Sequence, residues 1–316
     1  MYKKAKPLYL ITETPLHAGS GSDLGYIDLP IQREKHTGYP KIEGSGLKGA
    51  LRQAFEAKSE DENYWIELNR VFGYDDQWFP DKIEESVKRV FEDNKDFAGA
   101  LGLTDARILL FPVKSLKGTF AWVTCRRVLT KFHHEMKDIC EIDPKDLFET
   151  PSQTGVSSNS LFVDHENSKI QLEEYIYEDL KANDDIKNLA NWFKSNIFNE
   201  SLPYWQDAIE KNLVVLEDDD FADFLQFSTE VHTRIKIDNE TGTVVDGALF
   251  TQEYLPSESV MYAMAMFSPE FKAKGMTKEQ VEKFFNDNKP NYFQLGGNAT
   301  IGKGIIHLIS KIESYE

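Results

Sequence analysis

The chain has 316 residues, of which 41% are hydrophobic and 12% aromatic, so it can bury a substantial core and is neither a disordered nor a fibrous protein. No run of about 18 apolar residues occurs, which argues against a membrane partner, and the two cysteines indicate a reducing compartment, so we expect a cytoplasmic protein. The formal net charge of −17 argues against a protein that coats nucleic acid generally. Basic side chains nevertheless gather in residues 1–52 and 97–134 of this acidic chain. This pattern indicates either a polyanion bound along one basic path or simply acidic faces in contact with water.

The first predicted elements surround a glycine-rich stretch. Residues 7–14 alternate between apolar and polar side chains, which predicts a strand. Residues 16–52 then read LHAGSGSDLGYIDLPIQREKHTGYPKIEGSGLKGALR. Gly19 and Gly21 carry no Cβ, so the backbone of this loop can approach a ligand closely.

A helix is expected from about residue 45 to residue 58. Ser45 is its expected N-cap, because a serine hydroxyl can accept from the free amides of the first turn. Lys48 and Arg52 are four residues apart and therefore share one face near the positive end of the helix. This arrangement predicts a helix that contacts phosphate groups.

The remaining elements mix strands and helices without a regular order. We expect an acidic helical insertion at 59–98, strands at 106–113 and 119–124, a helix at 125–137, a strand at 170–177, a helix at 184–198 and a short strand at 213–216. A hairpin with strands at 227–237 and 243–249 follows, then a strand at 259–267, a helix at 277–288 capped by Thr277, and strands at 292–295 and 305–309. Because strands and helices do not alternate regularly, the sequence predicts an α+β fold.

Asp28 is the first candidate for a catalytic residue. It lies in the glycine-rich loop a few residues before Arg33. A carboxylate in such a loop can hold a divalent metal or orient water at a scissile phosphate, or it can bind its own backbone as an ordinary turn residue. His17 can serve as an acid or a base in RNA cleavage, with a structural histidine as the alternative.

Two further candidates lie near the C-terminus. Glu253 and Tyr254 follow the predicted hairpin and either face a site or belong to an edge strand. Residues 297–303 match the GxxxxGK pattern of nucleotide-binding loops, but a glycine and a predicted strand follow Lys303 where magnesium binding needs a hydroxyl residue and a helix. We therefore reject a nucleotide hydrolase. Gly297 and Lys303 still offer backbone amides and a cation to a phosphate, with a tight turn as the alternative.

Four stretches together resemble one known family. LHAGSG, YIDLPIQREKHTGYPKIEGSGLKGALR, TRIKIDNETGTVVDGALFTQEYLP and GGNATIGKG occur in this order, and they resemble the RAMP superfamily, more narrowly the repeated backbone subunit of the Cmr module in type III-B CRISPR effectors. The resemblance implies a modified RRM-like (ferredoxin-like) core in a single domain over residues 1–316, with helical, acidic insertions at about 59–98 and 138–225. It also implies a protruding β-hairpin thumb, for which residues 227–255 are the candidate.

The same resemblance implies a function. Copies of such a subunit stack in a helical filament along CRISPR RNA, together with other Cmr subunits, and cleave complementary single-stranded target RNA at regular intervals as a metal-dependent endoribonuclease. Asp28 matches the catalytic aspartate and would hold Mg²⁺ or Mn²⁺ at the RNA site, where the 2′-hydroxyl of the RNA attacks the adjacent phosphate. His17, Glu253 and Tyr254 fall in matching segments and are secondary catalytic candidates. The RNA-binding residues implied are Lys48, Arg52, Arg33, Gly19, Gly21, Ser45, Lys303 and Gly297.

An alternative function comes from a different class. The net charge of −17 is unusual for a filament on RNA. If the basic segments do not form one continuous groove, it favours an RNA-binding scaffold without catalysis of its own, whose activity resides in partner subunits. Asp28 discriminates between the two functions, because a scaffold does not need this carboxylate.

Overall fold

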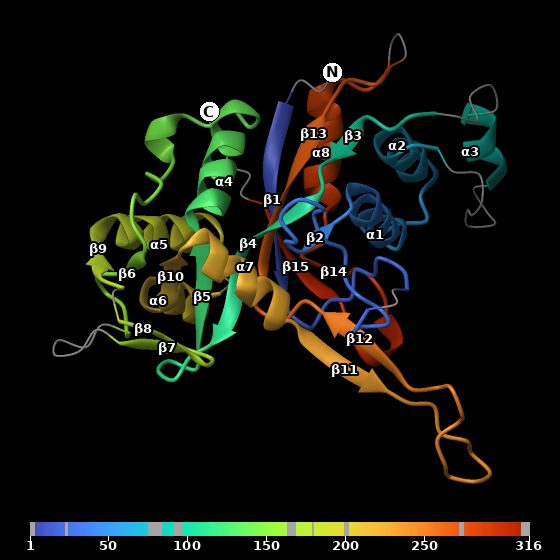
Figure 1. Cartoon of the computed structure of the whole chain (residues 1–316). Helices are drawn as coiled ribbons and strands as arrows, with labels where there is room; N and C mark the ends of the chain where they lie inside the picture. Colours follow the sequence, from blue (N-terminus) through green and yellow to red (C-terminus); the bar gives the residue numbers. More distant parts are fainter. Residues whose placement is uncertain are drawn as a thin grey trace.

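The computed structural model describes residues 4–22, 25–74, 84–91, 97–162, 169–178, 180–198, 202–271 and 275–310 (Figure 1). Its helices are α1 (Gly44–Glu56), α2 (Glu62–Phe72), α3 (Glu84–Phe91), α4 (Arg126–Asp138), α5 (Asp184–Asn196), α6 (Pro203–Asn212), α7 (Asp218–Phe227) and α8 (Lys278–Asn288). Its strands are β1 (Lys4–Thr12), β2 (Lys41–Ile42), β3 (Leu101–Leu103), β4 (Ala106–Lys114), β5 (Phe120–Cys125), β6 (Gly155–Ser157), β7 (Ile170–Leu172), β8 (Tyr175–Tyr177), β9 (Ala182–Asn183), β10 (Leu213–Leu216), β11 (Glu230–Arg234), β12 (Phe250–Tyr254), β13 (Val260–Phe267), β14 (Tyr292–Gln294) and β15 (Ile305–Ile309). Short 3₁₀ turns lie at Pro144–Asp146 and Ala299–Ile301.

A large mixed sheet forms the centre of the molecule. Its strands follow the order β14-β15-β1-β13-β4-β5-β10-β6-β9, with β2 paired to β4 and β3 paired to β13. Strand β13 pairs with β1 in an antiparallel register from Lys4↔Phe267 to Ile11↔Val260, and it is buried along almost its whole length. Such continuous burial is expected for a strand that is covered on both faces. The strands predicted at 106–113, 213–216 and 259–267 are confirmed within one residue.

Helices pack on this sheet in two groups, one around α1 and α8 and one around α4 and α5 (Figure 1). In the first group the ring of Phe55 on α1 stacks on Phe285 of α8 at 5.6 Å, and Phe285 meets Phe267 of β13 at 5.7 Å. In the second group Phe132 of α4 meets Tyr262 of β13 at 4.8 Å. Aromatic side chains therefore fill both helix–sheet layers, and the predicted capping of α8 by Thr277 is confirmed as a capping box.

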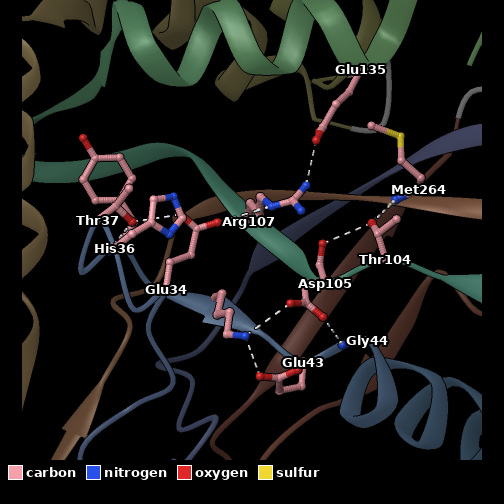
Figure 2. Close-up of polar contacts among 12 residues, drawn as sticks. Glu34, His36, Thr37, Glu43, Gly44, Thr104, Asp105, Arg107, Glu135 and Met264 are labelled. Atoms are coloured by element: carbon pink, nitrogen blue, oxygen red, sulfur yellow. Dashed lines mark hydrogen bonds and ion pairs between the residues drawn. The ribbon is translucent and has the colours of Figure 1, made fainter. Parts of the chain in front are cut away.

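The start of α1 differs from the expectation. Ser45 lies within the first turn and is exposed. Glu43 is the N-cap residue, and its side chain makes no hydrogen bond to the helix amides. Instead the carboxylate of Asp105 accepts from the Gly44 amide at 2.9 Å and from Lys41 Nζ at 3.2 Å (Figure 2). The prediction of Ser45 as N-cap is therefore wrong, because the capping carboxylate comes from the connection between β3 and β4, which is distant in sequence.

The segment 138–225 is more than a helical insertion. It contains α5, α6 and α7, but also β6, β9 and β10, which join the main sheet. Strand β10 pairs in parallel with β5, and β6 pairs with β10. The insertion at 59–98 contains α2 and α3, and parts of it lie outside the described residues.

The predicted hairpin is longer than expected. Strand β11 pairs with β12 rather than with residues 243–249, from Glu230↔Tyr254 to Arg234↔Phe250, and beyond it only the Ile237↔Val244 bridge is formed within the described residues. Gly247 has a positive φ of 74°, which interrupts the predicted second strand. In Figure 1 the hairpin projects away from the body of the molecule.

The α+β class is confirmed by this mixed architecture, and the RRM-like core stays a prediction. Among the residues that the structure describes, no helix is both long enough and apolar enough to cross a bilayer.

Candidate functional site

The loop that carries Asp28 lies beside strand β12 and bonds to its backbone. The Leu29 amide donates to the Thr251 carbonyl at 3.0 Å, and the Glu253 amide donates to the Leu29 carbonyl at 3.0 Å. Leu29 thereby forms a parallel bridge with Gln252. Because β12 pairs with β11 at the start of the hairpin and Asp28 bonds to Thr251 of β12, Asp28 lies at the base of this hairpin, which projects from the body in Figure 1.

Asp28 is bound to Thr251 from both sides. The Thr251 amide and hydroxyl donate to Asp28 Oδ2 at 2.7 and 2.8 Å, and the Asp28 amide donates to Thr251 Oγ1 at 3.0 Å. Hydrogen bonds from the Thr251 backbone and side chain lower the pKa of the Asp28 carboxyl, because they stabilise its charged form. The carboxylate is exposed to solvent. It is therefore ionised at neutral pH, fixed through Oδ2 and accessible to a ligand.

Glu253 has a different environment, because only 2% of its surface is exposed. Its carboxylate accepts from the Ile31 amide at 3.0 Å, from Arg33 Nη2 at 2.5 Å and from Thr229 Oγ1 at 2.8 Å. These bonds join the loop after Asp28 to the start of β11 and to β12. Glu253 thus anchors the loop from within, and its carboxylate does not face an open site.

His17 lies in a cradle of glycines. Its Nδ1 is 2.8 Å from the Glu253 carbonyl, which can only accept, so Nδ1 carries a proton and, when the ring is neutral, the lone pair lies on Nε2. A Cβ at Gly19 would lie 2.8 Å from Nε2, and one at Gly296 would lie 2.4 Å from the His17 carbonyl. The Gly297 amide donates to that carbonyl at 2.9 Å. The two glycine-rich loops therefore meet at this ring.

Tyr254 connects the C-terminal loop to the hairpin base. It is fully buried, and burial raises the pKa of its phenol. Its hydroxyl donates to Gln252 Oε1 at 2.8 Å and accepts from Asn298 Nδ2 at 3.1 Å. Lys303 Nζ lies 5.1 Å from the ring centroid and Arg234 Cζ 5.9 Å, both within the range of cation–π contacts.

The C-terminal loop does not have the geometry of a nucleotide-binding loop. Asn298 and Gly302 have positive φ, at 67° and 74°, on either side of the turn Ala299–Ile301, and strand β15 follows Lys303. The helix that such a loop requires is absent at this place in the described chain, which supports the rejection of a nucleotide hydrolase. Gly21, in the first loop, has a φ of 101° with open space around it.

Lys48 is the best-placed cation on α1. Its side chain is half-buried, and burial, with the nearby charge of Arg52, lowers the pKa of its ammonium group. Among the described residues, no hydrogen bond or ion pair engages this ammonium. A partly desolvated cation without a counter-charge is suited to bind a phosphate.

The two arginines are committed to partners within the chain. Arg52 donates to Glu56 Oε1, to the Gly73 carbonyl and to Asn69 Oδ1 at 2.5–3.0 Å. Arg33 donates to Glu253 and also to the carbonyls of Gly38 and Leu225 at 2.8 and 3.0 Å. Both guanidinium groups therefore join elements of the fold, and we do not include them among the proposed RNA-binding residues.

Sequence reasoning missed Thr251, Gln252, Asn298 and Arg234. A signal existed for Thr251, because the alternation in FTQEY places it on the same face of a strand as Glu253. Asn298 and Arg234, which bond to each other at 3.2 Å, are brought together by tertiary structure alone.

Asp28 is the candidate ligand for a divalent metal, and its surroundings show whether it could hold one. No group of three or more histidine, cysteine, aspartate or glutamate side chains among the described residues is arranged to hold a metal. Mg²⁺ often binds through only one or two carboxylates together with substrate phosphates. Both Thr251 bonds end on Oδ2 of Asp28, so its Oδ1 fits the role of such a single carboxylate ligand.

Comparison with known proteins points to one family. Residues 9–307 match the model of the RAMP superfamily. The CRISPR system Cmr endoribonuclease Cmr4 of Pyrococcus furiosus is 34% identical to this chain, with 98% of this chain and 96% of the relative covered. The CRISPR system CMR subunit Cmr4 of Saccharolobus solfataricus is 28% identical, with 97% and 96% covered.

Solved structures agree with this result. The crystal structure of oligomeric Cmr4 from Pyrococcus furiosus superposes with a TM-score of 0.69 at 28% identity, covering 98% of this chain and 99% of that one. A type III-B Cmr-beta complex bound to cognate target RNA contains a chain with the same fold, at a TM-score of 0.72 and 23% identity, with 98% of both chains covered. Since the family model spans nearly the whole sequence and a relative is 34% identical along it, this chain belongs to the RAMP superfamily.

Proposed function

We propose that this chain is a backbone subunit of a type III-B CRISPR ribonucleoprotein, in which it binds CRISPR RNA and cleaves complementary target RNA at regular intervals. The observation that carries the proposal is the Asp28 carboxylate, which is ionised, exposed and fixed at the base of the hairpin. It occurs in a chain that is 34% identical over nearly its full length to a protein named as an endoribonuclease. A scaffold without catalysis would not need a carboxylate held in this way.

The partners follow from the same relatives. Copies of this chain assemble with one another, as oligomeric Cmr4 from Pyrococcus furiosus does, and with CRISPR RNA, target RNA and other Cmr subunits. The hairpin of β11 and β12 projects from the body (Figure 1) and is the candidate thumb that displaces a nucleotide of the guide–target duplex. Asp28 lies at its base, next to the place where a displaced nucleotide would expose its backbone.

The reaction uses the 2′-hydroxyl of the target RNA. Its oxygen loses a proton and forms a bond to the adjacent phosphorus, the bond from phosphorus to the 5′-oxygen breaks, and the leaving 5′-oxygen takes up a proton from water, so the products are a 2′,3′-cyclic phosphate and a 5′-hydroxyl. A carboxylate with a lowered pKa is a weak base at neutral pH, so Asp28 orients the hydroxyl rather than removing its proton. His17 is the candidate proton acceptor, because its Nε2 has a free lone pair.

A divalent cation belongs to this proposal. Asp28 Oδ1 and phosphate oxygens of the RNA would hold Mg²⁺ or Mn²⁺, and the bound cation would neutralise charge on the scissile phosphate. Glu253 is too deeply buried to be a second ligand.

A target with a single 2′-deoxynucleotide at one cleavage position tests this chemistry. With the assembled complex and magnesium or manganese, we expect the cut at that position to disappear while the other cuts persist, because the attacking hydroxyl is missing there only. Product ends are checked by mass spectrometry for the cyclic phosphate. A cut that persists at the deoxy position contradicts the proposed reaction.

Replacement of Lys48 by alanine is expected to weaken binding of guide RNA without destabilising the chain. Removing one lysine–phosphate interaction lowers the slope of log K against log salt by about 0.7 for single strands. Burial and the nearby charge of Arg52 both disfavour the charged form of Lys48. Removing the Lys48 ammonium group therefore relieves its repulsion with Arg52. Titrations of labelled guide RNA at several salt concentrations measure the slope.

The matched control for Lys48 is Lys283→Ala on α8, where the lysine is exposed and paired with Asp287. Equal salt slopes for wild type and Lys48→Ala would remove α1 from the RNA-binding surface.

A further inference from the structure

We propose that Thr251 is a positioning residue for cleavage, because its hydroxyl and amide aim the Asp28 carboxylate from the base strand of the hairpin. The inference rests on the proposed function, since it assigns a role toward the carboxylate that the proposal makes catalytic. Neither residue pattern nor family resemblance singled out Thr251. It is identified by the contacts that converge on Asp28.

The Thr251 hydroxyl satisfies two groups of Asp28 at once. A threonine hydroxyl has one proton to donate and lone pairs to accept. Here it donates to Oδ2 of the carboxylate and accepts from the amide of the same aspartate, at 2.8 and 3.0 Å. The carboxylate is thereby fixed relative to its own backbone, and Oδ1 is turned away from the bonds with Thr251. Such fixed orientation is what a reacting hydroxyl or a cation requires.

Thr251 is itself fixed by the hairpin. It pairs with Thr233 across the β11–β12 ladder, and its carbonyl accepts from the Leu29 amide. One residue of the hairpin base therefore holds both the loop backbone and the catalytic carboxylate. A hairpin that is seated on a guide–target duplex would thus set the orientation of Asp28 through this single residue.

A different role would leave the same contacts. A threonine that merely ties an exposed loop to a strand would contribute to loop order but not to the rate of the reaction. The two roles separate when the hydroxyl is removed while shape and strand preference are kept. Valine has nearly the same shape as threonine and keeps the backbone amide bond to Oδ2, and serine keeps the hydroxyl.

The experiment compares single-turnover cleavage of a labelled target RNA by the assembled complex with Thr251→Val, Thr251→Ser and Thr233→Val. Thr233 is the matched control, because it is the cross-strand partner of Thr251, is exposed and carries the same side chain. We expect Thr251→Val to cleave ~10- to 100-fold more slowly, as for a misplaced catalytic group. Thr251→Ser and Thr233→Val should cleave close to the wild-type rate, with target binding unchanged in all three.

A second readout does not depend on activity. The Asp28 amide donates to the Thr251 hydroxyl, whereas the Leu29 amide donates to the Thr251 carbonyl. In Thr251→Val, hydrogen exchange should therefore accelerate at the Asp28 amide and stay slow at the Leu29 amide. Thr251→Ser should preserve protection at both amides.

Asp28→Ala in the same assay distinguishes failure of the positioning role of Thr251 from failure of the proposed function. If Asp28→Ala abolishes cleavage but Thr251→Val cleaves at the wild-type rate, the positioning role is wrong and the proposed function stands. If Thr251→Ser is as slow as Thr251→Val, the hydroxyl is not the determinant and the inference is again overturned. If Asp28→Ala cleaves normally, the proposed function fails and the role of Thr251 fails with it.

Discussion

Replacement of Asp28 by alanine is expected to abolish target cleavage by the assembled complex while leaving assembly and RNA binding intact. The carboxylate is exposed, and among the described residues the side chain that it bonds to is that of Thr251. Its loss therefore removes the group that we propose to align the 2′-hydroxyl and hold a cation, with little effect on packing. A positioned catalytic group of this kind contributes about 10²- to 10⁴-fold in rate, which gel analysis of single-turnover cleavage measures.

The control for this variant is Asp287→Ala on α8, which removes an exposed aspartate paired with Lys283. It keeps the net charge equal to that of Asp28→Ala and should cleave as wild type does. Cleavage by Asp28→Ala within a few-fold of the wild-type rate would move the search to His17 or to another subunit. Tight target binding without cleavage by the wild-type complex would favour the scaffold.

Replacement of Glu253 by alanine is expected to destabilise the chain by about 3–5 kcal/mol, the range found when one partner of a buried ion pair is removed. The carboxylate is 2% exposed and its partner Arg33 is 23% exposed at the side chain. Its loss leaves this guanidinium, the Ile31 amide and the Thr229 hydroxyl without their acceptor. Urea unfolding of the purified chain measures the change in free energy.

Glu253→Gln is the conservative comparison, because the amide keeps the shape and one acceptor oxygen, so the loss of stability should be smaller than for alanine. Glu230→Ala is the matched control on β11, where the glutamate contacts His232 at the surface, and should change stability by no more than about 0.5 kcal/mol. A free energy of unfolding for Glu253→Ala equal to that of wild type would show that the loop is not anchored through this carboxylate.

Short sequence patterns predicted the strands and the helix cap that depend on interactions between residues close together in the chain. The apolar runs at β4, β10 and β13 and the Thr277 cap of α8 lie where expected, because hydrophobic pattern and capping act within a few residues. The cap of α1 could not be predicted in this way. Its carboxylate is Asp105, 61 residues from the Gly44 amide that it binds.

The fold brings the candidate catalytic residues together, whereas their roles stay predictions. His17, Asp28, Glu253 and Tyr254 meet at β12 as a group, although loop and strand are more than 200 residues apart. Burial, which no local pattern reveals, turns Glu253 into an anchor rather than a reacting group. Arg52 likewise shares a helix face with Lys48 as expected but is bonded within the fold.

The most direct test of the claim that this chain itself cuts target RNA is a titration of complexes reconstituted from mixtures of wild-type and Asp28→Ala copies. Asp28 and Thr251 bond to each other within one chain, so we expect each copy to act independently. We expect the yield of every cut to fall in proportion to the fraction of wild-type copies. Cuts whose yield does not change as Asp28→Ala copies replace wild type would contradict it.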